Sequence, residues 1–220
     1  MRYRRRNAFA LALVLVLVVS TPLAAAGLRA GLRVVRMEPR GSDAEDYSKA
    51  SWGGGLYVLY APPGPGLFAF TGGFDVANML SQTVVFRDRV TGLRIEQQTN
   101  QWFSRFYLGG RFGPQGHGFI RPYAGANIAL VYYSISTDVV IPDDRNYEDE
   151  IRQNLEREGE AAFGFDFSLG IELKVHDRVW IDGGAKYLKS FGVPQQLGAD
   201  AEKIHPEYIQ AYLGVEVGII

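Results

Sequence analysis

Large apolar residues alternate strictly with small or polar residues along positions 162–176 of the chain. The odd positions from Phe163 to Val175 hold only Phe, Leu, Ile or Val, whereas the even positions from Ala162 to His176 hold Ala, Gly, Ser or charged and imidazole side chains. Because successive side chains of a β-strand point to opposite faces, the pattern predicts one strand with an apolar face and a polar face. The alternation far exceeds the roughly 5 or 6 residues of a common globular strand.

Seven further segments alternate in the same manner. Their connections are long and short in strict turn, which is typical of an up-and-down barrel whose two ends face different environments. The segments are Leu28–Met37, Trp52–Ala61, Leu67–Val76, Gln101–Phe112, Phe119–Asp138, Val179–Ser190 and Glu207–Ile220.

Two of the long connections show patterns of their own. In the connection 77–100, two short alternating runs flank Val90-Thr91-Gly92, which predicts a β-hairpin that stands in water and adds no membrane-crossing strand. In the acidic connection 139–160, Tyr147, Ile151 and Leu155 recur at helical spacing, which indicates a short helix. This acidic segment lacks the spacing of a calcium-binding loop, so we interpret it as a solvated loop.

Alternation alone does not show which face of the barrel points outward, since a lipocalin-like soluble barrel also alternates. The apolar face is crowded with Phe, Trp, Leu and Ile, more than the narrow interior of eight strands can hold. Strands of about ten or more residues also match a tilted crossing of the hydrocarbon layer. We therefore predict an all-β fold, an eight-stranded antiparallel up-and-down transmembrane β-barrel with short periplasmic turns and long outer loops. A soluble secreted barrel is the alternative.

The polar face carries charges of both signs, which we expect to pair inside the barrel because an unpaired charge there would be costly. The expected lumen network consists of Arg29, Arg33, Asp75, Arg105, Arg111, Arg121, Asp166, Glu172, Lys174, Asp182, Lys186 and Glu216.

Aromatic residues lie at both ends of the apolar face. Trp52 and Trp102 are expected at the long-loop ends of their strands, and Tyr60, Phe68 and Phe112 at the short-turn ends. This placement predicts two interfacial aromatic girdles.

The N-terminus has the pattern of a secretory signal peptide. Arginines among the first six residues precede an apolar run at 8–19 and an A-x-A site formed by Ala24 and Ala26, so cleavage is expected before Gly27. The predicted organisation is a cleaved leader, residues 1–26, and a barrel domain, residues 27–220; an uncleaved anchor is the alternative. Four of the 23 basic residues lie in the leader and the chain has 24 acidic residues, so the remainder is net negative and disfavours nucleic acid as a partner.

Candidate catalytic chemistry is sparse. Ser190, Asp200 and His205 fall in one loop region and could form a nucleophile, acid and base, but no spacing rule supports that arrangement. The chain has no cysteine and three histidines, so it has no disulfide and no thiolate ligand. We predict no catalytic residue, no cofactor and no metal site.

Two stretches carry a resemblance to a known family. They are Arg121-Pro122-Tyr123-Ala124-Gly125-Ala126, and the hairpin formed by residues 165–174, the turn His176-Asp177-Arg178 and residues 179–187. Both resemble the small eight-stranded OmpA/OmpX-like outer-membrane β-barrels of Gram-negative bacteria. The resemblance implies Sec-type export, insertion by the barrel-assembly machinery and a location in the cell outer membrane. The chain ends in Ile220, where such barrels usually end in an aromatic residue.

We therefore expect a non-enzymatic outer-membrane protein, a structural or interaction module that presents four extracellular loops while a charged network plugs its lumen. One alternative is a narrow channel or transporter for small or hydrophobic molecules, and another is a lipid-modifying outer-membrane hydrolase. The expected partners are outer-membrane lipid, the barrel-assembly machinery and an extracellular ligand of unknown identity.

Overall fold

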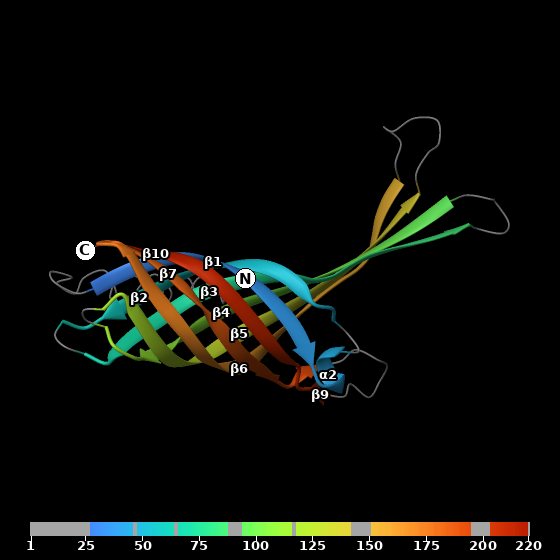
Figure 1. Cartoon of the computed structure of the whole chain (residues 1–220). Helices are drawn as coiled ribbons and strands as arrows, with labels where there is room; N and C mark the ends of the chain where they lie inside the picture. The colour runs from blue at the N-terminus through green and yellow to red at the C-terminus, as the bar shows by residue number, and fades with distance from the viewer. Residues whose placement is uncertain are drawn as a thin grey trace, which may run out of the picture.

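Eight antiparallel strands form a closed barrel in the computed structural model (Figure 1). The structure describes residues 27–45, 48–63, 66–87, 94–115, 118–141, 151–194 and 203–219. The predicted signal peptide, with Ala24 and Ala26 of its cleavage site, lies outside the described residues, and Gly27 begins the first strand.

Each strand of the barrel pairs with its neighbour in the chain, and the last strand closes the ring on the first. The register of this closing pair runs from Arg29 opposite Gly218 to Arg40 opposite Glu207. The predicted all-β, antiparallel, up-and-down fold is confirmed. The barrel strands are β1 (Gly27–Arg40), β2 (Ser51–Ala61), β3 (Phe68–Arg87), β4 (Arg94–Phe112), β5 (Ile120–Ile141), β6 (Ile151–His176), β7 (Val179–Phe191) and β10 (Glu207–Gly218).

The side chains follow the predicted alternation between exterior and interior. In β6 the Leu169 side chain is 70% exposed and its neighbour Ser168 is 6% exposed. The exterior is correspondingly apolar, with exposed Leu, Ile, Val and Phe on the barrel strands. Trp52 and Trp102 lie exposed toward the long-loop end and Phe112 at the short-turn end of this surface, as the girdle hypothesis requires.

Strands β3 to β6 continue beyond the other strands at the long-loop end and form a four-stranded extension (Figure 1). Strand β2 follows β3 only as far as Ala77, and β7 pairs with β6 only from Phe163 onward. The predicted hairpin in the connection 77–100 is confirmed as the β3–β4 part of this extension, although its expected tip at 90–92 lies outside the described residues.

The predicted short helix in the acidic connection is wrong for the residues that the structure describes. Ile151 and Leu155 lie in β6, which pairs with β5 from Ile141 opposite Ile151 onward; Tyr147 lies outside the described residues. Helical spacing of apolar residues is a weak predictor, and here the ladder to β5 provides backbone partners on both sides of an irregularity at Leu155.

Small elements that the sequence did not predict close the long-loop end. The helix α2 (Ser42–Glu45) begins after Gly41, whose φ of +74° suits glycine, and its Ala44 is 1% exposed against the interior. The two-stranded pair β8 (Val193–Pro194) and β9 (Lys203–Ile204) lies in the connection between β7 and β10. Among the described residues no helix is long and apolar enough to cross a membrane.

The exterior position of Leu169 yields a first prediction. Leu169→Arg should lower the free energy of unfolding by about 2–4 kcal/mol, because it places a charge on the outer face near the middle of the predicted membrane crossing. Ser168→Ala, one residue away on the inner face, should change it little. Urea titration of both variants folded in lipid vesicles measures the difference, and equal costs would contradict the assigned faces.

Candidate functional site

The barrel interior gathers most of the predicted charges into two connected clusters. The cluster nearer the short turns contains two arginines and three acids, two of which both arginines contact. Arg29 contacts Glu172 at 2.7 Å and Glu216 at 2.8 Å. Arg111 contacts the same two acids at 2.6 and 3.1 Å, and Asp182 at 2.8 Å. These residues come from β1, β4, β6, β7 and β10, so the ion pairs cross the lumen.

Tyrosine hydroxyls supply further donors to the acids of this cluster. The Tyr57 hydroxyl, which has one hydrogen to donate, lies 3.0 Å from Asp182 and 3.1 Å from Glu216. Tyr123 donates to the other oxygen of Asp182 at 2.5 Å and lies 2.5 Å from the Tyr212 hydroxyl. A buried carboxylate with several donors is far less costly than an isolated one.

The second cluster lies further toward the long-loop end and is centred on Asp75, which is fully buried. Arg33 binds both oxygens of Asp75 at 2.6 and 2.8 Å. Arg105 bridges Asp75 at 2.5 Å and Asp166 at 2.8 Å, and Asn127 donates to Asp166 at 2.7 Å. The bidentate arginine geometry gives this cluster a defined shape as well as charge balance.

Three predicted members of the network, Lys186, Arg121 and Lys174, lie at the margins of the two clusters or away from them. The Lys186 ammonium is buried over the rings of Tyr107 and Tyr212, at 4.8 and 5.2 Å from their centroids. Arg121 is 3.8 Å from Glu172. Lys174 does not join the clusters.

The Lys174 side chain lies at the edge of the barrel, 34% exposed, and its Nζ donates to Asp177 in the β6–β7 turn at 3.1 Å. This hydrogen bond lowers the pKa of the exposed Asp177 carboxyl. The predicted polar parity of Lys174 is correct, but its position near the end of β6 lets its long side chain reach the turn.

Sequence reasoning missed an apolar layer inside the long-loop end. Phe103 lies at its centre, with ring centroids 5.5 Å from Tyr133 and 5.8 Å from Tyr208. Each of these residues occupies an inward position, so the parity of the strands was the signal that could have found them. The layer also contains Met37, Ala44, Ala77, Met79, Ala129, Val131, Ala162, Leu188 and Val193.

Two glycines make room for the interior side chains. A Cβ atom on Gly55 would collide with the Asp75 carboxylate that binds Arg33. A Cβ atom on Gly170 would collide with the Tyr123 hydroxyl and would lie 2.6 Å from the Tyr212 hydroxyl. Gly55 therefore relieves crowding around the Asp75 carboxylate.

The candidate hydrolase residues are not arranged as a catalytic set among the described residues. The Ser190 hydroxyl is buried and lies 3.0 Å from the Tyr133 hydroxyl. The Nδ1 atom of His205 accepts a hydrogen bond from the Gly192 backbone at 3.2 Å. Asp200 lies outside the described residues. Among the residues that the structure describes, no group of three or more His, Asp or Glu side chains is arranged to hold a metal ion.

A closed ring of eight strands with an apolar exterior and paired charges inside defines an integral membrane β-barrel. Residues 9–216 match the family model described as "Outer membrane protein beta-barrel domain". The chain belongs to this family and is an integral protein of the cell outer membrane.

Solved structures agree with this fold. Neisserial surface protein A (NspA) shares 12% identity at a TM-score of 0.56, over 88% of this chain and 99% of its own. A major outer membrane protein from Thermus thermophilus shares 11% identity at a TM-score of 0.54, over 86% of this chain and 98% of its own. At these identities the likeness concerns the fold alone. No curated protein sequence matches the chain.

The central position of Asp75 yields a second prediction. Asp75→Asn should lower the free energy of unfolding by about 3–5 kcal/mol, because it leaves Arg33 and Arg105 buried with a lost counter-charge. Glu96→Gln removes the partner of Arg94 in the exposed extension, and should cost no more than about 1 kcal/mol. Denaturant titration in vesicles compares the two, and a small effect of Asp75→Asn would contradict the importance of the cluster.

The close packing at Gly170 yields a third prediction. Gly170→Ala should lower the free energy of unfolding by about 1–3 kcal/mol, since the added methyl must displace two tyrosine hydroxyls. Gly54→Ala is the matched control, because its Cβ would meet only the Arg33 carbonyl oxygen at 3.6 Å. The temperature at which the folded, fast-migrating band disappears from detergent gels reports both variants. An unchanged temperature for Gly170→Ala would show that the tyrosines are free to move.

Proposed function

We propose that this outer-membrane barrel is non-enzymatic and serves as a structural and interaction module, with a closed lumen and an outer surface built for contacts. The observation that carries the proposal is the filling of the interior. Two ion clusters occupy its middle and the short-turn side, and the apolar layer around Phe103 occupies the long-loop side. An eight-stranded barrel is only wide enough for such side chains to fill it.

The extension formed by β3 to β6 supports the interaction role. The last part of β3, residues 81–87, is exposed, including Val84, Val85 and Phe86 at 44–50%. Beyond Ala77 the edge of β3 has no pairing with β2, although the Met79 carbonyl accepts a hydrogen bond from the Lys49 backbone at 3.1 Å. We propose that the backbone donors and acceptors of the edge from residue 81 onward pair with an extended segment of a partner. We propose that the outer loops and this extension together form the contact surface for an extracellular partner.

The proposal extends to partners during biogenesis and in the membrane. Outer-membrane lipid surrounds the apolar exterior, and the barrel-assembly machinery inserts the chain after Sec-type export. We expect no nucleic acid partner, in keeping with the net negative charge of the chain.

A narrow channel is the main alternative, and it would require a continuous path past the ion clusters. The fully buried Asp75 and Asp182 and the buried Arg105 stand across that path. A lipid-modifying hydrolase would require a nucleophile paired with a base, whereas Ser190 faces Tyr133 and His205 faces the Gly192 backbone.

A bilayer recording tests the proposed function. The purified protein should show no steady single-channel conductance, because its interior is filled. Arg105→Ala and Arg121→Ala should therefore cause no fall in conductance. A regular conductance that falls in those two variants would favour the channel. Hydrolysis of a phospholipid substrate that disappears in His205→Ala would favour the enzyme. Boiled and unboiled samples must migrate differently on detergent gels, as the control for folding.

A further inference from the structure

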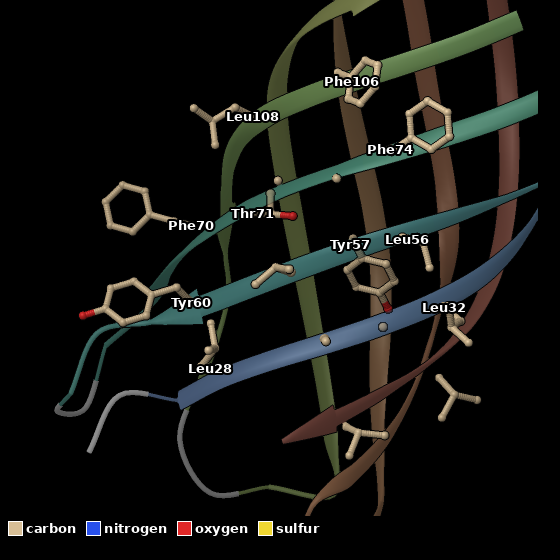
Figure 2. A pocket seen from close by; sticks show the side chains of 17 residues that line it. Leu28, Leu32, Leu56, Tyr57, Tyr60, Phe70, Thr71, Phe74, Phe106 and Leu108 are labelled. Atoms are coloured by element: carbon tan, nitrogen blue, oxygen red, sulfur yellow. The ribbon is translucent and has the colours of Figure 1, made fainter. Parts of the chain in front are cut away.

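The lipid-facing surface of β10 and of β1 to β4 is hollowed by an apolar groove (Figure 2). The groove has a volume of about 1280 Å³, and its lining is almost entirely apolar. The polar atoms of two lining residues belong to the interior rather than to the groove, since the Tyr57 hydroxyl bonds to Asp182 and Glu216 and Thr71 is buried on the inner face.

The strand register explains why a groove forms here. Outward residues of adjacent strands form rows across the barrel surface, and a row of small residues lies between two rows of large ones. The lower row is Leu28, Tyr60 and Phe70, and the upper row is Leu32, Leu56, Phe74 and Phe106. The middle row is Ala30, Val58 and Gly72, and it ends at larger residues on both sides, Val217 of β10 and Leu108 of β4. Because the middle row lacks bulk, the rows above and below it become the walls.

Gly72 has no side chain and lies beside Leu108, which bounds the groove on β4. A Cβ atom on Gly72 would lie 3.2 Å from Leu108 Cδ1, so even a methyl would press on this end of the groove. At the other end of the same row, Ala30 pairs with Val217 of β10. The groove thus lies between Val217 of β10 and Leu108 of β4, which are four strand spacings apart, or roughly 19 Å at about 4.8 Å per spacing.

The groove lies toward the short-turn end of the barrel. Along the outer face of β2, Val58 is one outward position from Tyr60 at the short-turn end and is far from Trp52 at the long-loop end. Short turns of outer-membrane barrels face the periplasm, so the groove opens into the periplasmic leaflet, which consists of phospholipid. Tyr60 forms the corner of the lower wall (Figure 2), where its hydroxyl can reach the polar interface.

We propose that this groove is a binding site for one acyl chain of a phospholipid in the periplasmic leaflet. Its apolar lining spans roughly 19 Å from β10 to β4, which is comparable with the thickness of one leaflet, half of the roughly 30 Å hydrocarbon core. Its walls offer the chain contacts on both sides and on its floor, which a flat barrel surface does not. The proposal does not depend on the closed lumen or on the outer loops.

Lipid retention tests the site. Wild-type protein folded in vesicles of phosphatidylethanolamine and phosphatidylglycerol is transferred to detergent, and native mass spectrometry counts the phospholipids that remain bound. We expect one phospholipid to persist on wild type at a lipid concentration at least tenfold lower than on Gly72→Leu, which fills the floor. Ala30→Phe fills the groove from β1 and should have the same effect.

Gly183→Leu is the matched control. Gly183 also faces lipid, on β7, and its Cβ would lie 3.4 Å from Leu213 Cδ1, but it is not part of the groove. All variants must show the heat-dependent shift of a folded barrel. Equal retention by wild type and the two groove-filling variants would overturn the site. A dimer that dissociates in Gly72→Leu, or retention of lipopolysaccharide in place of phospholipid from native membranes, would overturn it in favour of another occupant.

Discussion

Backbone hydrogen bonding in hydrocarbon is the constraint on which this structure depends. A strand that crosses the membrane finds no water for its N–H and C=O groups, so the sheet must close on itself. The pairing of β1 with β10 from Arg29 to Arg40 supplies that closure. Because a shift of one residue in the pairing of a strand would exchange the two faces of that strand, the same register also holds the apolar side chains outward. The closed ring of strand pairs and the apolar exterior therefore both follow from placing a sheet in hydrocarbon.

Closure creates a narrow interior that must be filled, and the chain fills it with charge. Isolated buried charges are very unfavourable, so each arginine of the clusters shares acids with its neighbours, and tyrosines supply further donors. Glycines opposite these groups, such as Gly55 and Gly170, leave the space that the large side chains need. The extension of β3 to β6 escapes this constraint because it stands beyond the barrel, where open edges and exposed apolar residues can serve contacts with other molecules.

The sequence predicted those features that depend on the period of two. Strand faces and the charges on them could be assigned, because parity alone decides whether Asp75 or Leu169 points inward. Features that depend on neighbours across space were missed. The start of β6 at Ile151 depends on its hydrogen-bond ladder to β5. The helix α2 depends on the packing of Ala44 against the interior apolar layer. Lys174 lies outside the charge clusters because Asp177 in the adjacent turn is within hydrogen-bond distance. The strand residues of the apolar layer around Phe103 lie at the same inward-facing positions as the charged residues, so alternation alone did not distinguish them as a separate layer.

The most direct test of the account measures which side of β6 faces lipid. The chain has no cysteine, so a single cysteine can be placed at each position from 163 to 175 and labelled with a nitroxide in the folded, vesicle-bound protein. Collision with oxygen, which concentrates in hydrocarbon, should be high at odd positions and low at even ones. Low oxygen collision at the odd positions, or no alternation at all, would contradict a barrel with an apolar exterior and a charge-filled interior.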